Sequence, residues 1–90
     1  MGRKNRNLKD ENFDRHRIQK INEIKFYLCH QIDKASHRRR FDYKMLAEFL
    51  GTSQGAVSRV VNKRIDDVTV NQLFNYLTIL EPNFELLISF

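Results

Sequence analysis

The chain has 90 residues, with 16 Lys and Arg against 11 Asp and Glu, and a formal net charge of +5 at pH 7. A typical domain has about 100–150 residues, so this length excludes a two-domain enzyme with a cleft between its domains. The positive charge indicates an acidic partner, which could be nucleic acid, an anionic membrane surface or an acidic protein.

The composition also argues against several kinds of site. Cys29 is the single cysteine, so it cannot form an intramolecular disulfide, and no Cys and His residues have the spacing of a zinc finger. No stretch approaches the roughly 20 apolar residues of a membrane-spanning helix. We therefore expect a cytoplasmic protein with no metal, no cofactor and no membrane partner.

Basic residues are concentrated in the first half of the chain. Residues 1–44 hold 13 basic and 6 acidic side chains, whereas the remaining residues hold 3 and 5. Residues 1–12 have too little apolar surface to offset the entropy lost on ordering. We predict a flexible basic arm at 1–12, which would be a minor-groove arm, a solvated tail or a segment that wraps a toxin, followed by one domain at 13–90.

The domain begins with a predicted amphipathic helix at 13–36. Its apolar stripe recurs at steps of three and four residues and comprises Ile18, Ile21, Leu28 and Ile32, with Lys25 in the same row. Three arginines follow, at 38–40. This run is compatible with a solvated helix end, where cations are favoured, and with a contact to DNA.

The second and third helices are predicted from their end signals. Asp42 is a good N-cap for the second helix, and Gly51 can end it. Its apolar face comprises Leu46, Ala47, Phe49 and Leu50. Ser53 can cap the third helix, which has a polar outer face and an inner face of Val57, Val60 and Val61.

The end of the chain combines a fourth helix with a strand. Thr69 and Gln72 form a capping box for a helix at about 70–80, and Pro82 follows it. The pattern then changes to a period of two, with Phe84, Leu86, Ile88 and Phe90 on one face. A solitary strand leaves its edge unpaired, so we expect a homodimer with an antiparallel ribbon at 84–90; packing on its own bundle and completion by a different protein stay open.

The segment from Tyr43 to Gln72 has the features of a helix-turn-helix, two short helices joined by a glycine-containing turn. The run from Leu46 to Arg59, LAEFLGTSQGAVSR, resembles the phage-repressor-like, XRE-type helix-turn-helix family. The leading helix and the closing segment from Glu81 to Leu86 are similar to small antitoxins of the HigA type within that family.

This resemblance implies a fold and a function. The fold would be mainly α, a compact bundle of four to five helices with a C-terminal strand that pairs across a dimer. The function would be sequence-specific repression through a palindromic operator in duplex DNA. The chain would be the antitoxin of a type II toxin–antitoxin operon, which neutralises its cognate toxin and represses its own operon.

The resemblance places the recognition positions on Ser53, Gln54, Gly55, Ser58 and Arg59. The amide of Gln54 can bond to adenine N6 and N7, and the guanidinium of Arg59 suits guanine O6 and N7. Gly55 would leave a base contact to the backbone or to Ala56. Predicted phosphate or positioning residues are Tyr43, Lys44, Ser53, Ser58, Asn62, Lys63 and Arg64.

The sequence departs from the family at three positions. Tyr43 stands where the family commonly has Gln, and Gly55 lacks a side chain where one often reads a base. The usual Gly after the third helix is absent, and we expect Asn62 to adopt the left-handed conformation there.

Two functions of other classes are alternatives. A small basic ribonuclease toxin would be about this size, but it would need a mixed sheet around its substrate groove. A protein-interaction module with a silent helix-turn-helix would bind no duplex even at low salt.

Overall fold

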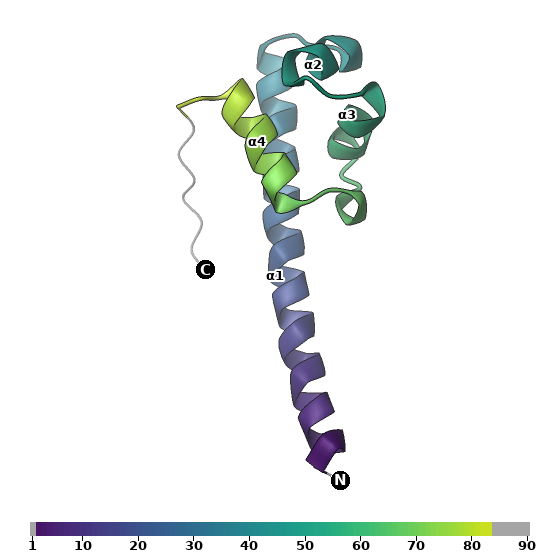
Figure 1. Cartoon of the computed structure of the whole chain (residues 1–90). Coiled ribbons are helices and arrows are strands. Elements are labelled where there is room, and N and C mark those ends of the chain that lie inside the picture. Colours follow the sequence, from purple (N-terminus) through teal and green to yellow (C-terminus); the bar gives the residue numbers. More distant parts are fainter. Residues whose placement is uncertain (1, 84–90) are drawn as a thin grey trace.

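The computed structural model describes residues 2–83, and the side chains of 15–83. Four α-helices follow one another in this part of the chain, with a 3₁₀ turn before the last (Figure 1). Their bounds are Gly2–Arg38 (α1), Tyr43–Leu50 (α2), Gln54–Val61 (α3), Ile65–Asp67 (η1) and Val70–Leu80 (α4). The expectation of a mainly helical fold is confirmed. The predicted strand with Phe84, Leu86, Ile88 and Phe90 lies outside the described residues.

α1 is the central helix of the molecule. α4 lies on one side of its C-terminal half, and α2 and α3 lie on the other (Figure 1). Its 37 residues correspond to about 56 Å of helix, which accounts for the 58 Å length of the molecule. The N-terminal part of α1 extends beyond the other helices. No described helix is both long enough and apolar enough to cross a membrane.

α1 is longer than predicted, because it begins at Gly2 rather than at residue 13. Residues 2–12, which we expected to form a flexible arm, are its first turns. They contain no proline, and Arg, Lys, Leu and Glu all have high helix propensity. Once the helix exists from residue 13 onward, each preceding residue adds a hydrogen bond without a new nucleation step. The prediction of an arm was based on composition alone. It did not consider that an existing helix can extend into these residues.

The core forms where α1 and α4 pack together. Leu28 and Ile32 of α1 are completely buried, as are Leu73 and Leu80 of α4. α2 and α3 extend this core with Leu46, Ala47, Leu50, Val57 and Val60. A buried side chain of this size contributes about 1.5–3 kcal/mol, so the apolar stripe of α1 decides where α3 and α4 attach.

Ile18 and Ile21 belong to the predicted stripe but are exposed, by 53% and 37%. Contacts with the rest of the molecule begin further along α1, at the partly buried Ile24 and at Lys25. The Lys25 ammonium donates to the Ile65 carbonyl of η1 at 3.0 Å. The predicted helical spacing of the apolar stripe is therefore correct. The part of the stripe that other helices cover is shorter than predicted, because η1 and α4 do not reach Ile18.

The predicted starts of α2, α3 and α4 are confirmed in atomic detail. The Asp42 carboxylate accepts from the Met45 N–H at 2.7 Å, and the Ser53 hydroxyl accepts from the Ala56 N–H at 3.1 Å. Thr69 and Gln72 make both hydrogen bonds of the capping box, at 2.9 and 3.1 Å. These caps fix where α2, α3 and α4 begin, and so fix the short turns between them.

Three helices end in the same left-handed turn. The residues with positive φ are Arg40 after α1 (58°), Gly51 after α2 (69°) and Lys63 after α3 (56°). Each donates its N–H three residues back, and the next residue donates five residues back, the pattern of a Schellman motif. For residues with a Cβ the left-handed conformation costs about 1–2 kcal/mol. Gly51 avoids that cost, whereas Arg40 and Lys63 do not.

The expectation that Asn62 is left-handed is wrong. Its φ is −86°, and its backbone N–H still bonds to the Ser58 carbonyl, so Asn62 closes α3 and the next residue makes the turn. The Asn62 amide also donates to the Ser58 hydroxyl at 3.1 Å. This pair extends the helix by one residue and moves the left-handed position to Lys63.

Phe49 is also placed differently from the prediction, which assigned it to the inner face of α2. It is 43% exposed and packs on Phe41, with ring centroids 5.2 Å apart. The Arg39 guanidinium lies 5.1 Å from the centre of its ring. Phe49 therefore belongs to a cluster at the junction of α1 and α2 and not to the main core.

Candidate nucleic-acid interface

α2 and α3 form a pair of eight-residue helices joined by the short turn at 51–53. Ala47 is 4% exposed, and Val57 and Val60 are buried in the same core, so α2 and α3 pack closely on each other. Val57 and Val60 also fix the rotation of α3 about its axis. The opposite side of α3 consequently faces solvent.

The exposed face of α3 contains the predicted recognition positions. At 100° per residue, Gly55 and Asn62 lie nearly opposite Val57 and Val60 and mark the middle of this face. Gln54 and Arg59 are exposed on its two flanks, about 140° apart around the helix. They therefore project to different sides of the face, and a single base pair cannot contact both. α3 contains no acidic residue.

The packing around α3 does not require glycine at position 55. A Cβ added there would meet only the Ser53 hydroxyl, at 3.8 Å, which is an ordinary contact. Within a helix glycine is less stable than alanine by about 0.5–1 kcal/mol. The packing of the chain therefore leaves this residue choice unexplained, and the middle of the face is left without a side chain.

Several predicted positioning residues are committed to internal hydrogen bonds. The Ser53 oxygen caps α3, which leaves its O–H free to donate to a further acceptor. Ser58 is half-buried and accepts from Asn62, so these two side chains act as a pair. Tyr43 and Lys44 are exposed in the first turn of α2.

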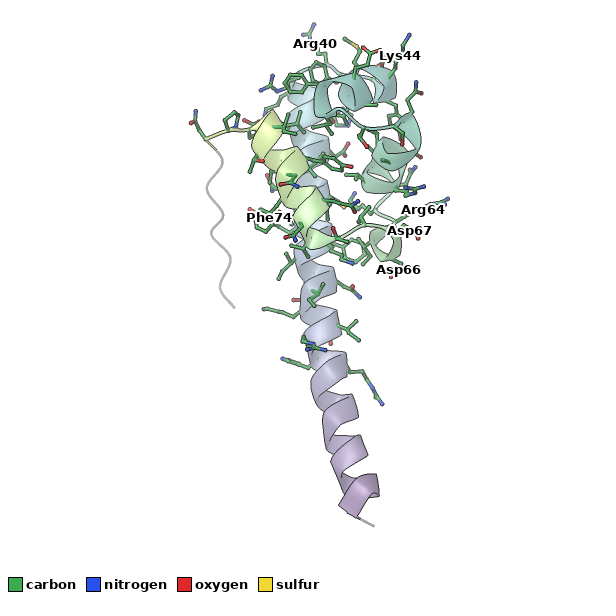
Figure 2. All side chains as sticks on the ribbon, viewed as in Figure 1. Arg40, Lys44, Arg64, Asp66, Asp67 and Phe74 are labelled. Carbon is green, nitrogen blue, oxygen red and sulfur yellow. The ribbon has the colours of Figure 1, made fainter. Side chains whose placement is uncertain are left out.

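The two ends of the α2–α3 surface differ in charge. At one end, where α1 meets α2, Arg40 and Lys44 extend outward at separate positions (Figure 2). At the other end, Lys63 and Arg64 are followed by the exposed Asp66 and Asp67 in η1. These carboxylates offset the two cations. At the Arg40 end, the exposed Asp42 likewise offsets part of the charge of Arg40 and Lys44.

The three arginines at 38–40 have separate roles, which their sequence did not indicate. Arg38 forms an ion pair with Glu81, and Arg39 donates to the Leu80 carbonyl at 2.6 Å. Both side chains therefore attach the end of α4 to the end of α1. Arg40 is exposed, and no hydrogen bond or ion pair of its side chain is found within the described part of the chain.

Cys29 is completely buried in α1. Burial raises the pKa of its thiol, while the charges of Lys63 and Lys25 act in the opposite direction. Among the described residues no three His, Cys, Asp or Glu side chains are grouped as metal ligands.

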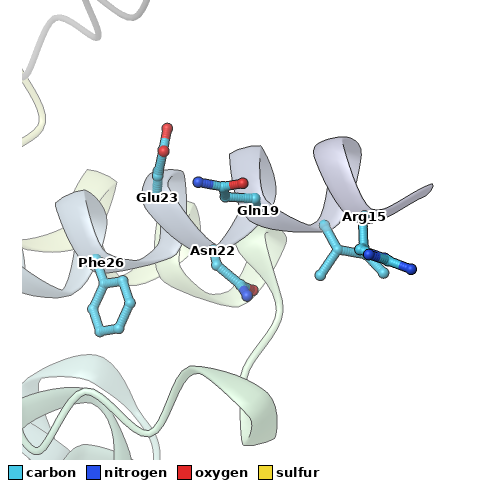
Figure 3. A pocket seen from close by; sticks show the side chains of 6 residues that line it. Arg15, Gln19, Asn22, Glu23 and Phe26 are labelled. Carbon is cyan, nitrogen blue, oxygen red and sulfur yellow. The ribbon is translucent and has the colours of Figure 1, made fainter. Parts of the chain in front are cut away.

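A depression runs along the part of α1 that precedes its buried residues (Figure 3). One face of the helix forms it, with Arg15, Ile18, Gln19, Asn22, Glu23 and Phe26. Its residues come from a single helix at steps of three and four, so it has no opposing wall.

The chain matches no protein-family model, no curated protein and no solved structure. Function is therefore inferred from the residues and the geometry described above.

Proposed function

We propose that this protein binds duplex DNA with α3 in the major groove and represses transcription. One observation carries the proposal: α3 is fixed by Val57 and Val60 and exposes a polar face without acidic residues, beside a cation on α2, Lys44, and cations at its own end. A helix fits the major groove, where amide and guanidinium groups distinguish base pairs. In this proposal Gln54 and Arg59 read bases on the two flanks of the face.

We further propose a homodimer that reads a palindrome, as the antitoxin of a toxin–antitoxin operon. Support for the dimer comes from the period-two pattern at 84–90, whose apolar residues need a partner strand. Support for the antitoxin role comes from the resemblance of the chain to HigA-type antitoxins. The ribonuclease alternative requires a mixed sheet, and residues 2–83 contain no strand, so DNA binding is preferred.

The proposal is tested by selecting duplexes from a random-sequence library with the purified protein at near-physiological salt. We expect enrichment of a palindrome whose half-sites are about 34 Å apart, one helical turn of DNA. An enriched single half-site would contradict the dimer but retain base reading. If the protein binds but the selected duplexes remain random in sequence, its positive charge contacts only the DNA backbone. Absence of binding at low salt would favour the interaction module.

Gly55→Ala separates folding from binding within this proposal. Because the added methyl has room inside the protein, we expect the free energy of unfolding to rise by about 0.5–1 kcal/mol. The same methyl would stand between α3 and the floor of the groove, so affinity for the selected duplex should fall about fivefold, equivalent to about 1 kcal/mol. Urea titration and fluorescence anisotropy measure the two effects. Unchanged affinity would show that no partner approaches Gly55 closely.

A further inference from the structure

Arg40 occupies a position for which the fold itself favours glycine. The same left-handed turn follows α2, where the chain uses Gly51 and has no steric cost. At the end of α1 the turn has the same two hydrogen bonds, from Arg40 N to the His37 carbonyl and from Phe41 N to the Ser36 carbonyl, both 3.0 Å. The backbone of Arg40 is thus strained, and glycine at this position would remove the strain.

Interactions inside the protein do not explain this arginine. Arg38 and Arg39 hold the end of α4, through Glu81 and the Leu80 carbonyl, and the Arg40 side chain adds no such contact among the described residues. The dipole of α1 favours a cation near its end, but His37 and Arg38 already occupy the last turn. Backbone strain is more frequent at functional sites than elsewhere, and the other strained residue with a side chain among the described residues, Lys63, also places a cation at an end of the α2–α3 surface.

The surroundings of Arg40 identify the chemistry of that ligand. Lys44 lies at the same end of the molecule, and both side chains extend outward there (Figure 2). Asp42 lies between them in sequence and is exposed, and one of its carboxylate oxygens accepts from the Met45 N–H at the start of α2. Arg40 and Lys44 are therefore two exposed cations near the start of α2. Exposed cations of this kind are suited to binding phosphate groups.

We propose that Arg40, together with Lys44, binds backbone phosphates of duplex DNA beside the N-terminal end of α2, and that this contact explains an arginine in a left-handed turn. The inference rests on the proposed function, since it assigns the duplex bound by α3 as the ligand. It divides the arginine run into two structural residues and one binding residue. Substitution of Arg40 should therefore affect folding and binding in opposite directions.

The test uses the full chain, a random-sequence duplex of about 20 base pairs and a series of salt concentrations. Arg40→Gly should raise the Tm by about 4–8 °C. It should also lower the slope of log K against log salt by about one unit and weaken binding about fivefold at 0.15 M salt, the effect of one lost phosphate contact. Arg40→Asn, which also tolerates the turn, should behave similarly. Arg40→Lys should keep the slope of the wild type.

Lys34→Ala is the matched control, because Lys34 is exposed on the side of α1 opposite to the buried Leu28 and Ile32. It removes the same charge and should leave the slope unchanged. An Arg40→Gly protein that binds like the wild type, or a Lys34→Ala protein that loses as much as Arg40→Gly, would overturn the assignment of Arg40 alone. A lowered Tm of Arg40→Gly would overturn the argument from strain. Failure of the wild type to bind any duplex would instead refute the proposed function, and this inference with it.

Discussion

Replacing Leu73 by alanine is expected to lower the free energy of unfolding by about 3 kcal/mol, within the 2–5 kcal/mol typical of buried leucines. Leu73 is completely buried on α4, in the core that α4 shares with α1. The surrounding helices cannot close fully over the lost volume, so a cavity adds to the lost apolar contact. Urea denaturation measures the change as a lower midpoint with an unchanged slope.

Ile79→Ala provides the control on the same helix. Ile79 is 42% exposed, and its truncation should cost less than about 1 kcal/mol. Similar losses for the two variants would contradict the packing of α4 on α1 described above. A loss near zero at Leu73 would do the same.

Arg59→Ala and Gln54→Ala are each expected to weaken binding to the selected operator by about 1–3 kcal/mol, a factor of about 5–150. Binding to random duplexes should change much less, because a base contact contributes only where the matching base is present. Competition binding with single base-pair variants of the operator measures both effects. Since the two side chains lie on opposite flanks of α3, each variant should relax preference at a different base pair.

Arg59→Lys distinguishes base reading from attraction by charge. Lysine keeps the charge but lacks the planar pair of donors that guanine O6 and N7 accept, so most of the specificity should be lost. Gln19→Ala removes an exposed amide from the protruding part of α1 and should have no effect on binding. Equal losses on all sequences for Arg59→Ala and Gln54→Ala would show that these residues contact phosphates or nothing.

The parts of the fold that sequence predicted correctly are those set by local chemistry. Asp42, Ser53 and the pair Thr69 and Gln72 are recognisable because a cap depends only on residues within one helical turn. Gly51 is recognisable because few other residues take a positive φ without cost. The buried face of α3 follows equally from the spacing of Val57 and Val60.

The parts that it missed depend on residues distant in the chain or on small energy differences. The contacts of Arg38 and Arg39 join residues more than 40 positions apart, so they exist only after α4 has packed on α1. The length over which α1 is covered depends on where η1 and α4 attach. The left-handed Lys63 in place of Asn62 depends on one additional hydrogen bond at the end of α3. Base contacts by Gln54 and Arg59 remain predictions.

The order of the helices along the chain has a consequence for biosynthesis. α1 and α4 are the first and last described helices, and each covers the apolar face of the other. At about 5–20 residues per second, a ribosome needs about 2–8 s to extend the chain from residue 39 to residue 80. During this interval Leu28 and Ile32 of the nascent chain have no partner on α4. α3 can pack on α1 before α4 is synthesised, so the contacts of α4 with α1 and α2 are the last of the described core to form, only after translation has passed α4.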